Sequence, residues 1–290
     1  MFEPRHYRYT RRRQLLTEQL EDRRMLAGPY APAAGELGST AVAKDDLAIE
    51  AWAKAVADYS PGTNVDAPFQ TPGKAVGPAE GTIEDVVSLG RGGAITLTFV
   101  APIRDGLGAD FAVFENSIND SFLELGFVEV SSDGSNFFRF ENDSLTSSSV
   151  DAFGENDPTD IHNLAGKYRR GFGTPFDLAE LSNVSPLLNI MRVTHVRLID
   201  IVGDGSQTDS SGDKIYDPFP TVGSAGLDVD AVGVIHQAAF VRDVIGFEDV
   251  GATLSAASAF SGPTANGSTI LGPFGTNVVV GTFQSEALRF

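Results

Sequence analysis

The chain carries its apolar residues in short runs that glycines and prolines interrupt. After Ser60 these runs are no longer than a β-strand, and the 290 residues include 31 Gly and 15 Pro. Short apolar runs bounded by Gly, Pro, Asn and Asp are typical of strands, whereas a helix needs a longer periodic segment. The pattern therefore predicts a body built mainly from strands. We expect these strands at residues 94–100, 110–115, 126–131, 136–140, 193–202 and 229–236.

One pair of expected strands is joined by a recognisable turn. The apolar segments 127–130 and 137–140 flank Asp133-Gly134. Asp-Gly tolerates the positive φ of a tight hairpin turn, so the sequence predicts a β-hairpin here.

A helical pattern precedes the strands. Apolar residues recur at i, i+4, i+7, i+8 and i+11 within residues 44–59, with Asp45 or Asp46 as a cap and Ser60-Pro61-Gly62 as a stop. We therefore expect a helix over 44–59 and one short helical turn at 176–181. The residues of the helical stripe are Ala48, Trp52, Ala55, Val56 and Tyr59.

Several short strands without regularly intervening helices predict two packed antiparallel sheets, because each strand has one apolar face to bury. We expect this all-β sandwich, with its one N-terminal helix and short helical turns, to span residues 44–237. Residues 28–43, with prolines and small side chains, are expected to form a linker. Residues 238–290 are expected to be the start of a second β-domain that this chain truncates, because two or three strands bury too little apolar area to be stable. The alternative is an extra strand pair on the sandwich edge.

The charge and the absence of cysteine exclude several classes of function. The net charge is −18, and the seven basic and four acidic residues of segment 1–27 leave −21 on the rest of the chain. Such a body repels nucleic acid and anionic lipid, so neither is an expected partner. The carboxylates suit a hard divalent cation such as calcium, or they simply keep the protein soluble. Without cysteine there is no disulfide, thiolate zinc site or cysteine nucleophile, and no apolar run is long enough for a transmembrane helix.

The first 27 residues are basic and do not form an ordinary signal peptide, because no apolar segment follows Arg11-Arg12-Arg13. Residues 19–27, QLEDRRMLA, resemble the short Leu-Glu-x-Arg-x-Leu-Leu motif at the start of many large surface and secreted proteins of planctomycete bacteria. The resemblance implies that residues 1–27 are a targeting segment and that the protein is extracellular or at the cell surface. The alternative is a basic amphipathic helix or a disordered arm.

Five ordered blocks between residues 51 and 235 resemble a family of bacterial cell-surface proteins with a jelly-roll body. The last block is also distantly similar to the last strand of galactose-binding-like carbohydrate-binding modules. The resemblance implies a jelly-roll-like sandwich. Residues 244–250 and 281–290 resemble blocks of a second β-domain found on such proteins. The five blocks are SLGRGGAITL (88–97), DFAVFEN (110–116), VEVSSDG (128–134), GTPFDLA (173–179) and LDVDAVGV (227–234).

Asp228 and Asp230 are the candidate metal ligands with the clearest spacing. Residues two apart in a strand project from the same face, about 7 Å apart, so both could reach one cation. Alternatively, both face solvent while their neighbours face the core. The carbohydrate-binding modules use an acid near this strand to hold structural calcium, and the resemblance gives that role first to Asp230. The surface-protein blocks imply Glu115 and Asn116 as its partners, with Glu50 as the other candidate.

No catalytic motif stands out in the sequence. The four histidines have no metal-binding spacing, and the segment 223–226 lacks the spacing of a nucleophile elbow. We therefore expect a non-catalytic surface module that binds a glycan or another surface ligand, with Trp52, Tyr168 and Tyr216 either stacking on sugar rings or packing in the core. One alternative is a purely structural or adhesive component of the cell envelope. The other is a polysaccharide hydrolase that uses two of Glu115, Glu124 and Glu129.

Overall fold

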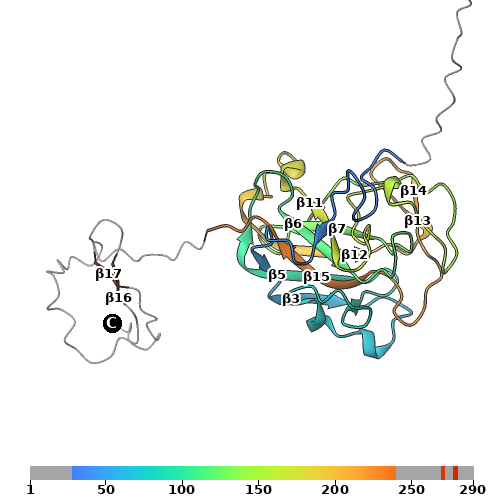
Figure 1. Ribbon diagram of the computed structural model, residues 1–290, viewed down its shortest axis with the longest axis horizontal. Helices are drawn as coiled ribbons and strands as arrows, with labels where there is room; N and C mark the ends of the chain where they lie inside the picture. The colour runs from blue at the N-terminus through green and yellow to red at the C-terminus, as the bar shows by residue number, and fades with distance from the viewer. Residues whose placement is uncertain (1–27, 240–268, 272–276, 280–290) are drawn as a thin grey trace, which may run out of the picture. The chain divides into compact units, whose positions relative to one another are not determined.

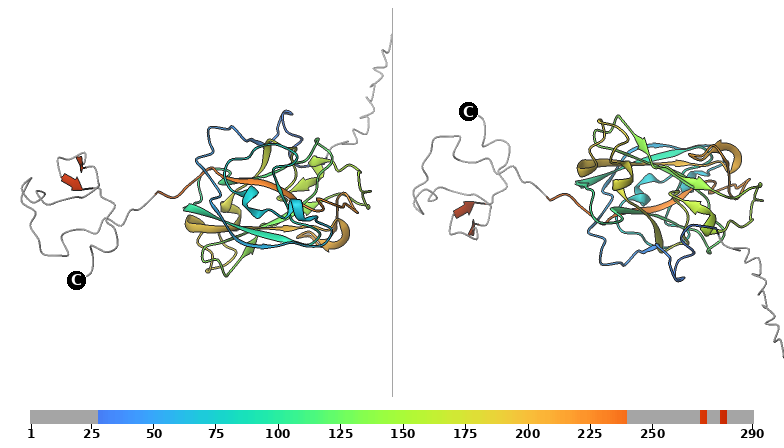
Figure 2. Two further views of the ribbon diagram at one scale, coloured as in Figure 1. Left: turned by 90° about the horizontal axis from the view of Figure 1, so that it is seen from below. Right: turned by 90° about the horizontal axis from the view of Figure 1, so that it is seen from above.

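The computed structural model describes residues 28–239, 269–271 and 277–279. The chain divides into two units between Phe240 and Val241. The first unit is an antiparallel β-sandwich (Figure 1), as the sequence predicts. Its two sheets lie as separate layers when the molecule is turned (Figure 2).

The first sheet has the strand order β1-β11-β6-β15-β2, and β4 also pairs with β15. The second sheet has the order β3-β5-β12-β7-β8. Along the chain, β5, β6 and β7 alternate between the sheets, as do β11, β12 and β15. This gives the strand order of a jelly roll, in which β15, the last described strand of the first unit, lies between β2 and β6. The strands of the first sheet are β1 (Val42–Ala43), β2 (Ala51–Trp52), β4 (Val87–Ser88), β6 (Phe111–Glu115), β11 (Phe172–Phe176) and β15 (Asp228–Val234), and those of the second are β3 (Ala55–Ser60), β5 (Ala94–Ile103), β7 (Gly126–Ser131), β8 (Phe138–Arg139) and β12 (Val193–Asp200).

Short elements connect the two sheets. Two small antiparallel pairs join β9 to β10 and β13 to β14. The predicted helical turn at 176–181 is confirmed as η4. These elements are β9 (Asp143–Ser144), β10 (Ile161–His162), β13 (Asp204–Thr208) and β14 (Lys214–Tyr216), with the 3-10 turns η1 (Ala67–Phe69), η2 (Pro72–Ala75), η3 (Pro158–Asp160), η4 (Leu178–Leu181) and η5 (Ile190–Arg192).

The core lies between the two sheets and follows the alternation of the strands. In β12, Val196 and Leu198 are fully buried, whereas the residue between them is half-exposed. Three aromatic rings link the sheets: Phe111 of β6, Phe176 of β11 and Phe140, whose backbone N–H donates to β7. Their centroids are 5.1 to 5.9 Å apart, within the range of favourable aromatic contacts.

The predicted hairpin between β7 and β8 is confirmed, although its loop is longer than a two-residue turn. Val130 pairs with Phe138 across six loop residues, 132–137. Asp133 Oδ1 accepts hydrogen bonds from the N–H groups of Ser135 and Asn136, both at 2.8 Å. These bonds hold the pKa of Asp133 well below its usual range. The side chain of Asp133 thus organises the loop.

The helix predicted over residues 44–59 is wrong, because these residues form β2 and β3. Trp52 pairs with Gly233 in the first sheet, and Tyr59 pairs with Ile95 in the second. Asp46 Oδ1 accepts from the Ala48 N–H at 2.9 Å in a local turn and does not cap a helix. A short amphipathic stripe favours a helix only weakly. Here the hydrogen bonding of β2 and β3 to the edges of the two sheets overrides that preference.

Residues 28–43, expected to be a linker, pack along the body of the first unit. The backbone N–H of Tyr30 donates to Thr159 O at 3.0 Å, and its hydroxyl donates to Asp143. Val42 pairs with Gly173, so β1 forms the outermost strand of the first sheet. Prolines and small residues suit this close backbone approach as well as they suit a linker.

The second unit contains the antiparallel pair β16 (Thr269–Leu271) and β17 (Asn277–Val279). The N-terminal motif at 19–27 and the blocks at 244–250 and 281–290 lie outside the described residues. Within the described part of the chain, no helix has the length and apolar character needed to cross a membrane.

Candidate functional site

Three buried carboxylates meet at one end of the first sheet. Glu115 ends β6, Asp228 begins β15, and Glu124 lies in the loop that leads to β7. Each offers an oxygen within 4.8 Å of the others, and Glu115 is only 2% exposed, Glu124 6% and Asp228 3%. Antiparallel pairing of Val229 with Glu115 brings the two strand ends together. We call Glu115, Glu124 and Asp228 the acidic cluster.

Two oxygens of the acidic cluster lack a hydrogen-bond donor. Glu115 Oε2 accepts from the Ser117 N–H at 2.6 Å, and Asp228 Oδ2 accepts from Asn116 Nδ2 at 3.1 Å. Glu124 Oε1 and Asp228 Oδ1 are buried without a partner. Leaving a buried carboxylate oxygen unpaired is costly, so among the described residues these two atoms call for a cation, a proton or a bound water.

Burial also perturbs the ionisation of the cluster. It raises the pKa values of Glu115 and Glu124 well above their usual range, and the neighbouring charge of Asp228 raises both further. Burial raises the pKa of Asp228 to about 7, although the polar side chains of Ser88, Asn116 and Ser224 oppose this shift. Among the described residues, no Lys, Arg or His forms an ion pair with these three acids. A bound cation would offset their repulsion.

Two further buried acids hold the loops around the acidic cluster. Asp200 accepts hydrogen bonds from the Gly92 N–H at 2.8 Å and from the Leu227 N–H at 2.7 Å. Leu227 directly precedes Asp228 in the chain. Asp217 accepts a hydrogen bond at 2.8 Å from the N–H of Leu125, the residue that follows Glu124. Burial raises the pKa of Asp200 to about 7 and that of Asp217 well above its usual range. These acids position the backbone that carries the cluster.

Asp230, expected to share a cation with Asp228, lies outside the acidic cluster. Its oxygens accept from the N–H groups of Glu80 at 3.0 Å and Gly81 at 2.8 Å. The ladder between β15 and β6 shifts register between Val229 and Ala231. Asp228 and Asp230 are both buried, so neither faces solvent. The other expected partner, Glu50, is exposed and accepts from the Gln237 N–H.

The three aromatics expected to stack on sugars lie on different elements. Trp52 on β2 is half-buried against Phe114, with ring centroids 5.4 Å apart. Tyr168 is 1% exposed, and its hydroxyl shares a hydrogen bond with Thr40. Tyr216 on β14 is half-buried. The ring of Tyr168 therefore has no open face for a sugar, and it serves as core packing.

Sequence reasoning included Glu124 only as a hydrolase candidate and assigned no role to Asp200. The local signal for Glu124 is its position between Leu123 and Leu125, because both leucines are fully buried. A single acid between two core leucines favours a buried carboxylate that needs a partner. Asp217 is buried through contacts with a distant loop, such as the hydrogen bond from the Leu125 N–H, and no local pattern in the sequence indicates this.

The acidic cluster offers only oxygen donors, which suit hard divalent cations such as calcium, magnesium and manganese. Three carboxylates from three chain segments can supply part of the six to eight oxygens that calcium takes. Neither a comparison with models of protein families nor one with curated protein sequences finds a match for this chain.

Proposed function

We propose that this chain is a non-catalytic β-sandwich module of the bacterial cell surface, stabilised by a structural calcium ion, that binds a glycan. Glu115, Glu124 and Asp228 would hold the ion. The observation that carries the proposal is the pair of buried carboxylate oxygens without a donor, on Glu124 and Asp228. An ion there would satisfy both oxygens and remove the repulsion among the three acids.

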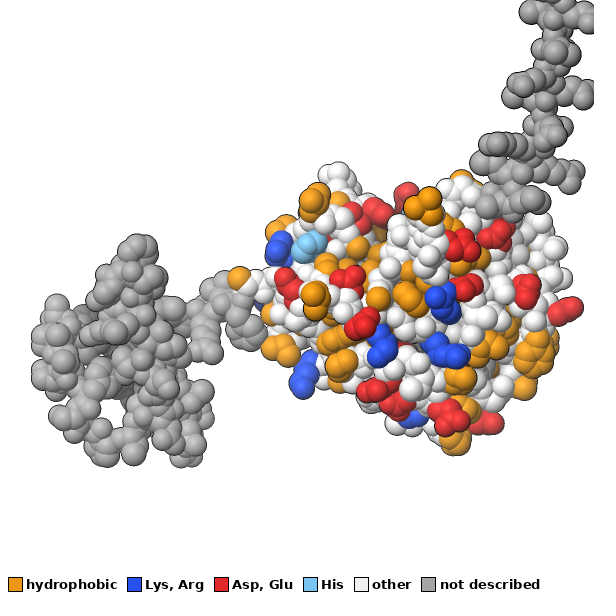
Figure 3. All heavy atoms as spheres, viewed as in Figure 1, with side chains coloured by type: hydrophobic (Ala, Val, Ile, Leu, Met, Phe, Trp, Pro, Cys, Tyr) orange, Lys and Arg blue, Asp and Glu red, His pale blue; other side chains and the backbone are white. Residues whose placement is uncertain are grey.

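The position of the acidic cluster gives the ion a structural role. The ends of β6 and β15 and the loop before β7 are far apart in sequence and meet at this point. A shared ligand would fix these three segments relative to one another. Elsewhere, acidic side chains are spread over the face of the first unit in Figure 3 without gathering in one patch, which is the arrangement of a solubilising surface.

Burial argues against a hydrolase at these carboxylates. The oxygens of the acidic cluster are close to the spacing of about 5 Å used by retaining glycosidases. However, catalytic acids must touch the scissile bond, and at 2% to 6% exposure these side chains are out of reach of a polysaccharide. The geometry favours binding an ion over glycan cleavage.

The cell-surface part of the proposal is supported by the resemblance of residues 19–27 to an export motif, and the proposed calcium site fits such a location. Calcium sites of extracellular modules work with dissociation constants of about 10⁻⁴ to 10⁻³ M, because the surrounding calcium is abundant. A site built from three carboxylates on separate segments fits such weak binding. The acidic body favours a glycan or another envelope component as partner over nucleic acid or anionic lipid.

Calcium removal tests the proposal. At 100 to 1,000 times its dissociation constant, calcium should stabilise the full chain by about 2.7 to 4.1 kcal/mol, which corresponds to a rise in melting temperature of about 5 to 15 °C. Melting curves recorded with calcium, with a chelator, and with magnesium after chelation measure this shift. We expect the chelator to lower the melting temperature and calcium to restore it. Magnesium should not restore it, because it demands a smaller octahedral site. Superimposable curves in calcium and chelator would refute the metal site.

A further inference from the structure

A third buried oxygen without a partner lies beside the acidic cluster. Ser88 ends β4 and is 0% exposed, and its Oγ has no hydrogen-bond partner among the described residues. A serine hydroxyl carries one donor and two acceptor lone pairs, and a buried one is almost always hydrogen-bonded in a folded protein. Ser88 Oγ therefore calls for a polar or charged group in the space that it borders.

Ser88 interrupts a run of core residues. Val86, Val87 and Leu89 are each 0% exposed. An apolar side chain is the usual occupant of such a position, because a buried hydroxyl gives up its hydration and gains little packing area in return. A hydroxyl at this point of the run is therefore costly unless a group inside the protein pairs with it.

The pairing of β4 with β15 brings this hydroxyl to the acidic cluster. Asp228 lies directly opposite Ser88 in the antiparallel ladder. Side chains of opposite residues lie on the same face of a sheet, with Cβ atoms about 4.5 to 5.5 Å apart. Asp228 Oδ1 is itself buried without a partner, and the Ser88 side chain favours the ionised form of this acid by lowering its pKa. The two unpaired oxygens therefore border the same space.

Hydrogen bonds to the backbone fix Ser88 in this place. The hydroxyl of Tyr59 donates to Ser88 O at 2.8 Å, and the Leu89 N–H donates to Leu227 O at 2.9 Å. Leu227 directly precedes Asp228, so these bonds hold the two chain segments side by side. A group that is already held in position loses little conformational entropy when an ion binds.

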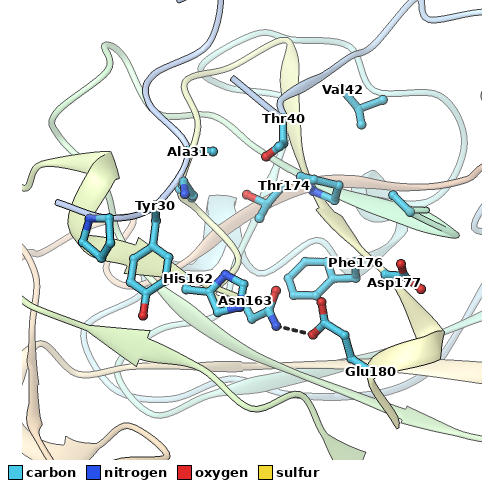
Figure 4. Close-up of a pocket in the computed structure, with 14 residues that line it drawn as sticks. Tyr30, Ala31, Thr40, Val42, His162, Asn163, Thr174, Phe176, Asp177 and Glu180 are labelled. Carbon is cyan, nitrogen blue, oxygen red and sulfur yellow. Dashed lines mark hydrogen bonds between the residues drawn. The ribbon is translucent and has the colours of Figure 1, made fainter. Parts of the chain in front are cut away.

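Two other hydroxyls in the described part of the chain are buried without a partner, but neither lies opposite a member of the acidic cluster. Thr174 on β11 pairs with Val113, beside a pocket between the N-terminal segment and η4 (Figure 4). Ser144 on β9 pairs with Ile161. The position opposite an unpaired carboxylate oxygen therefore distinguishes Ser88, and Ser144 offers a matched control.

We propose that Ser88 Oγ is a fourth protein ligand of the ion and that the resulting cage selects calcium over magnesium and manganese. The inference rests on the proposed calcium site and names the class of ion that this site accepts. With the hydroxyl added, four side chains from four chain segments surround the ion. Because each carboxylate can bind with two oxygens, the protein alone can approach the six to eight oxygens that calcium takes.

The burial of the cage provides the selectivity. Ser88 and the members of the acidic cluster are between 0% and 6% exposed, so an ion held inside the protein among them must give up most of its water. Magnesium dehydrates reluctantly and usually keeps several water ligands, and manganese shares its octahedral oxygen shell. Calcium accepts a larger and less regular shell, so protein oxygens can replace its water. The neutral hydroxyl adds a ligand without adding to the repulsion among the three carboxylates.

Ser88→Ala in the full chain tests the inference, with Ser144→Ala as the control because both serines are buried and carry an unpartnered hydroxyl. Melting temperatures are recorded after chelation and then at rising concentrations of calcium, magnesium or manganese. Ser88→Ala should need about 10- to 100-fold more calcium than the wild type for the same shift, the scale of a lost contact at a metal site. In chelator it should melt no lower than the wild type, because alanine removes an unpaired buried hydroxyl. Ser144→Ala should need the same calcium concentration as the wild type.

The outcomes separate the role of Ser88 from the proposed calcium site. A Ser88→Ala variant with the calcium response of the wild type overturns this role and leaves the calcium site standing. A variant that melts lower than the wild type by the same amount in chelator and in calcium also overturns it, since that pattern indicates packing alone. A wild type that responds to magnesium or manganese at the same concentration as to calcium overturns the ion class. A wild type that responds to none of the three ions overturns both the inference and the calcium part of the proposed function.

Discussion

Replacing Phe111 with alanine is expected to lower the free energy of unfolding by about 3 to 5 kcal/mol, the cost of deleting a large buried aromatic side chain. Phe111 is fully buried and stacks on Phe176, with ring centroids 5.3 Å apart. It also contacts Phe140, which directly follows β8 of the other sheet, so its loss would leave a cavity between the two sheets. For a body of this size the melting temperature should fall by about 6 to 20 °C.

Phe153→Ala is the matched control. Phe153 is 90% exposed, so its removal should change the free energy of unfolding by no more than about 0.5 kcal/mol. Equal destabilisation by the two substitutions in denaturant titrations would mean that the three phenylalanine rings do not form the centre of the sandwich.

The second large effect is expected from Glu124→Gln, and its sign depends on calcium. Without calcium, the acidic cluster must hold neighbouring negative charges or take up protons, and both cost free energy that a neutral amide avoids. The substitution should therefore stabilise the calcium-free protein by about 1 to 3 kcal/mol. With calcium, the variant should lose most of the gain of about 4 kcal/mol that the wild type shows at 1,000 times the dissociation constant.

The control for this experiment is Glu84→Gln, at an exposed glutamate outside the acidic cluster. It should follow the wild type with and without calcium. Chemical denaturation in calcium and in chelator measures both effects. An identical calcium-induced gain in Glu124→Gln and the wild type would show that Glu124 is not a ligand.

The all-β architecture could be predicted largely from the short apolar runs that glycines and prolines interrupt. The run 94–100 became β5, and 126–131 became β7 without change, because strand alternation is encoded locally and agrees with the burial of the sandwich. The order of strands required the resemblance to jelly-roll proteins, since residues such as Val229 and Glu115 pair across more than 100 positions of chain.

The error at residues 44–59 has a physical origin. Trp52, Val56 and Tyr59 fit a helical stripe, but they also fit two short strands that contribute to different sheets. Periodicity over so few residues cannot separate the two conformations. The free energy of the strand pairing comes from β15 and β5, which lie far away in the sequence.

The site was accessible to sequence reasoning only in part. Glu115 and Asn116 were predicted from the resemblance to surface-protein blocks and Asp228 from its spacing with Asp230, and the structure brings the three together. Glu124 and Asp230 show the limit, because the resemblance to carbohydrate-binding modules favoured Asp230, whereas loop geometry supplies Glu124. Which acids converge depends on how loops from different sheets fold over the strand ends, and no local pattern encodes that.

Calcium titration of the chelator-treated full chain, followed by calorimetry near neutral pH, tests the central claim most directly. We expect the wild type to show a calcium site that is lost in Glu124→Gln. The site should be kept in Asp230→Asn, whose side chain bonds to the backbone of residues 80 and 81. A wild-type chain that takes up no calcium, or an Asp230→Asn variant that loses the site while Glu124→Gln keeps it, would contradict the account.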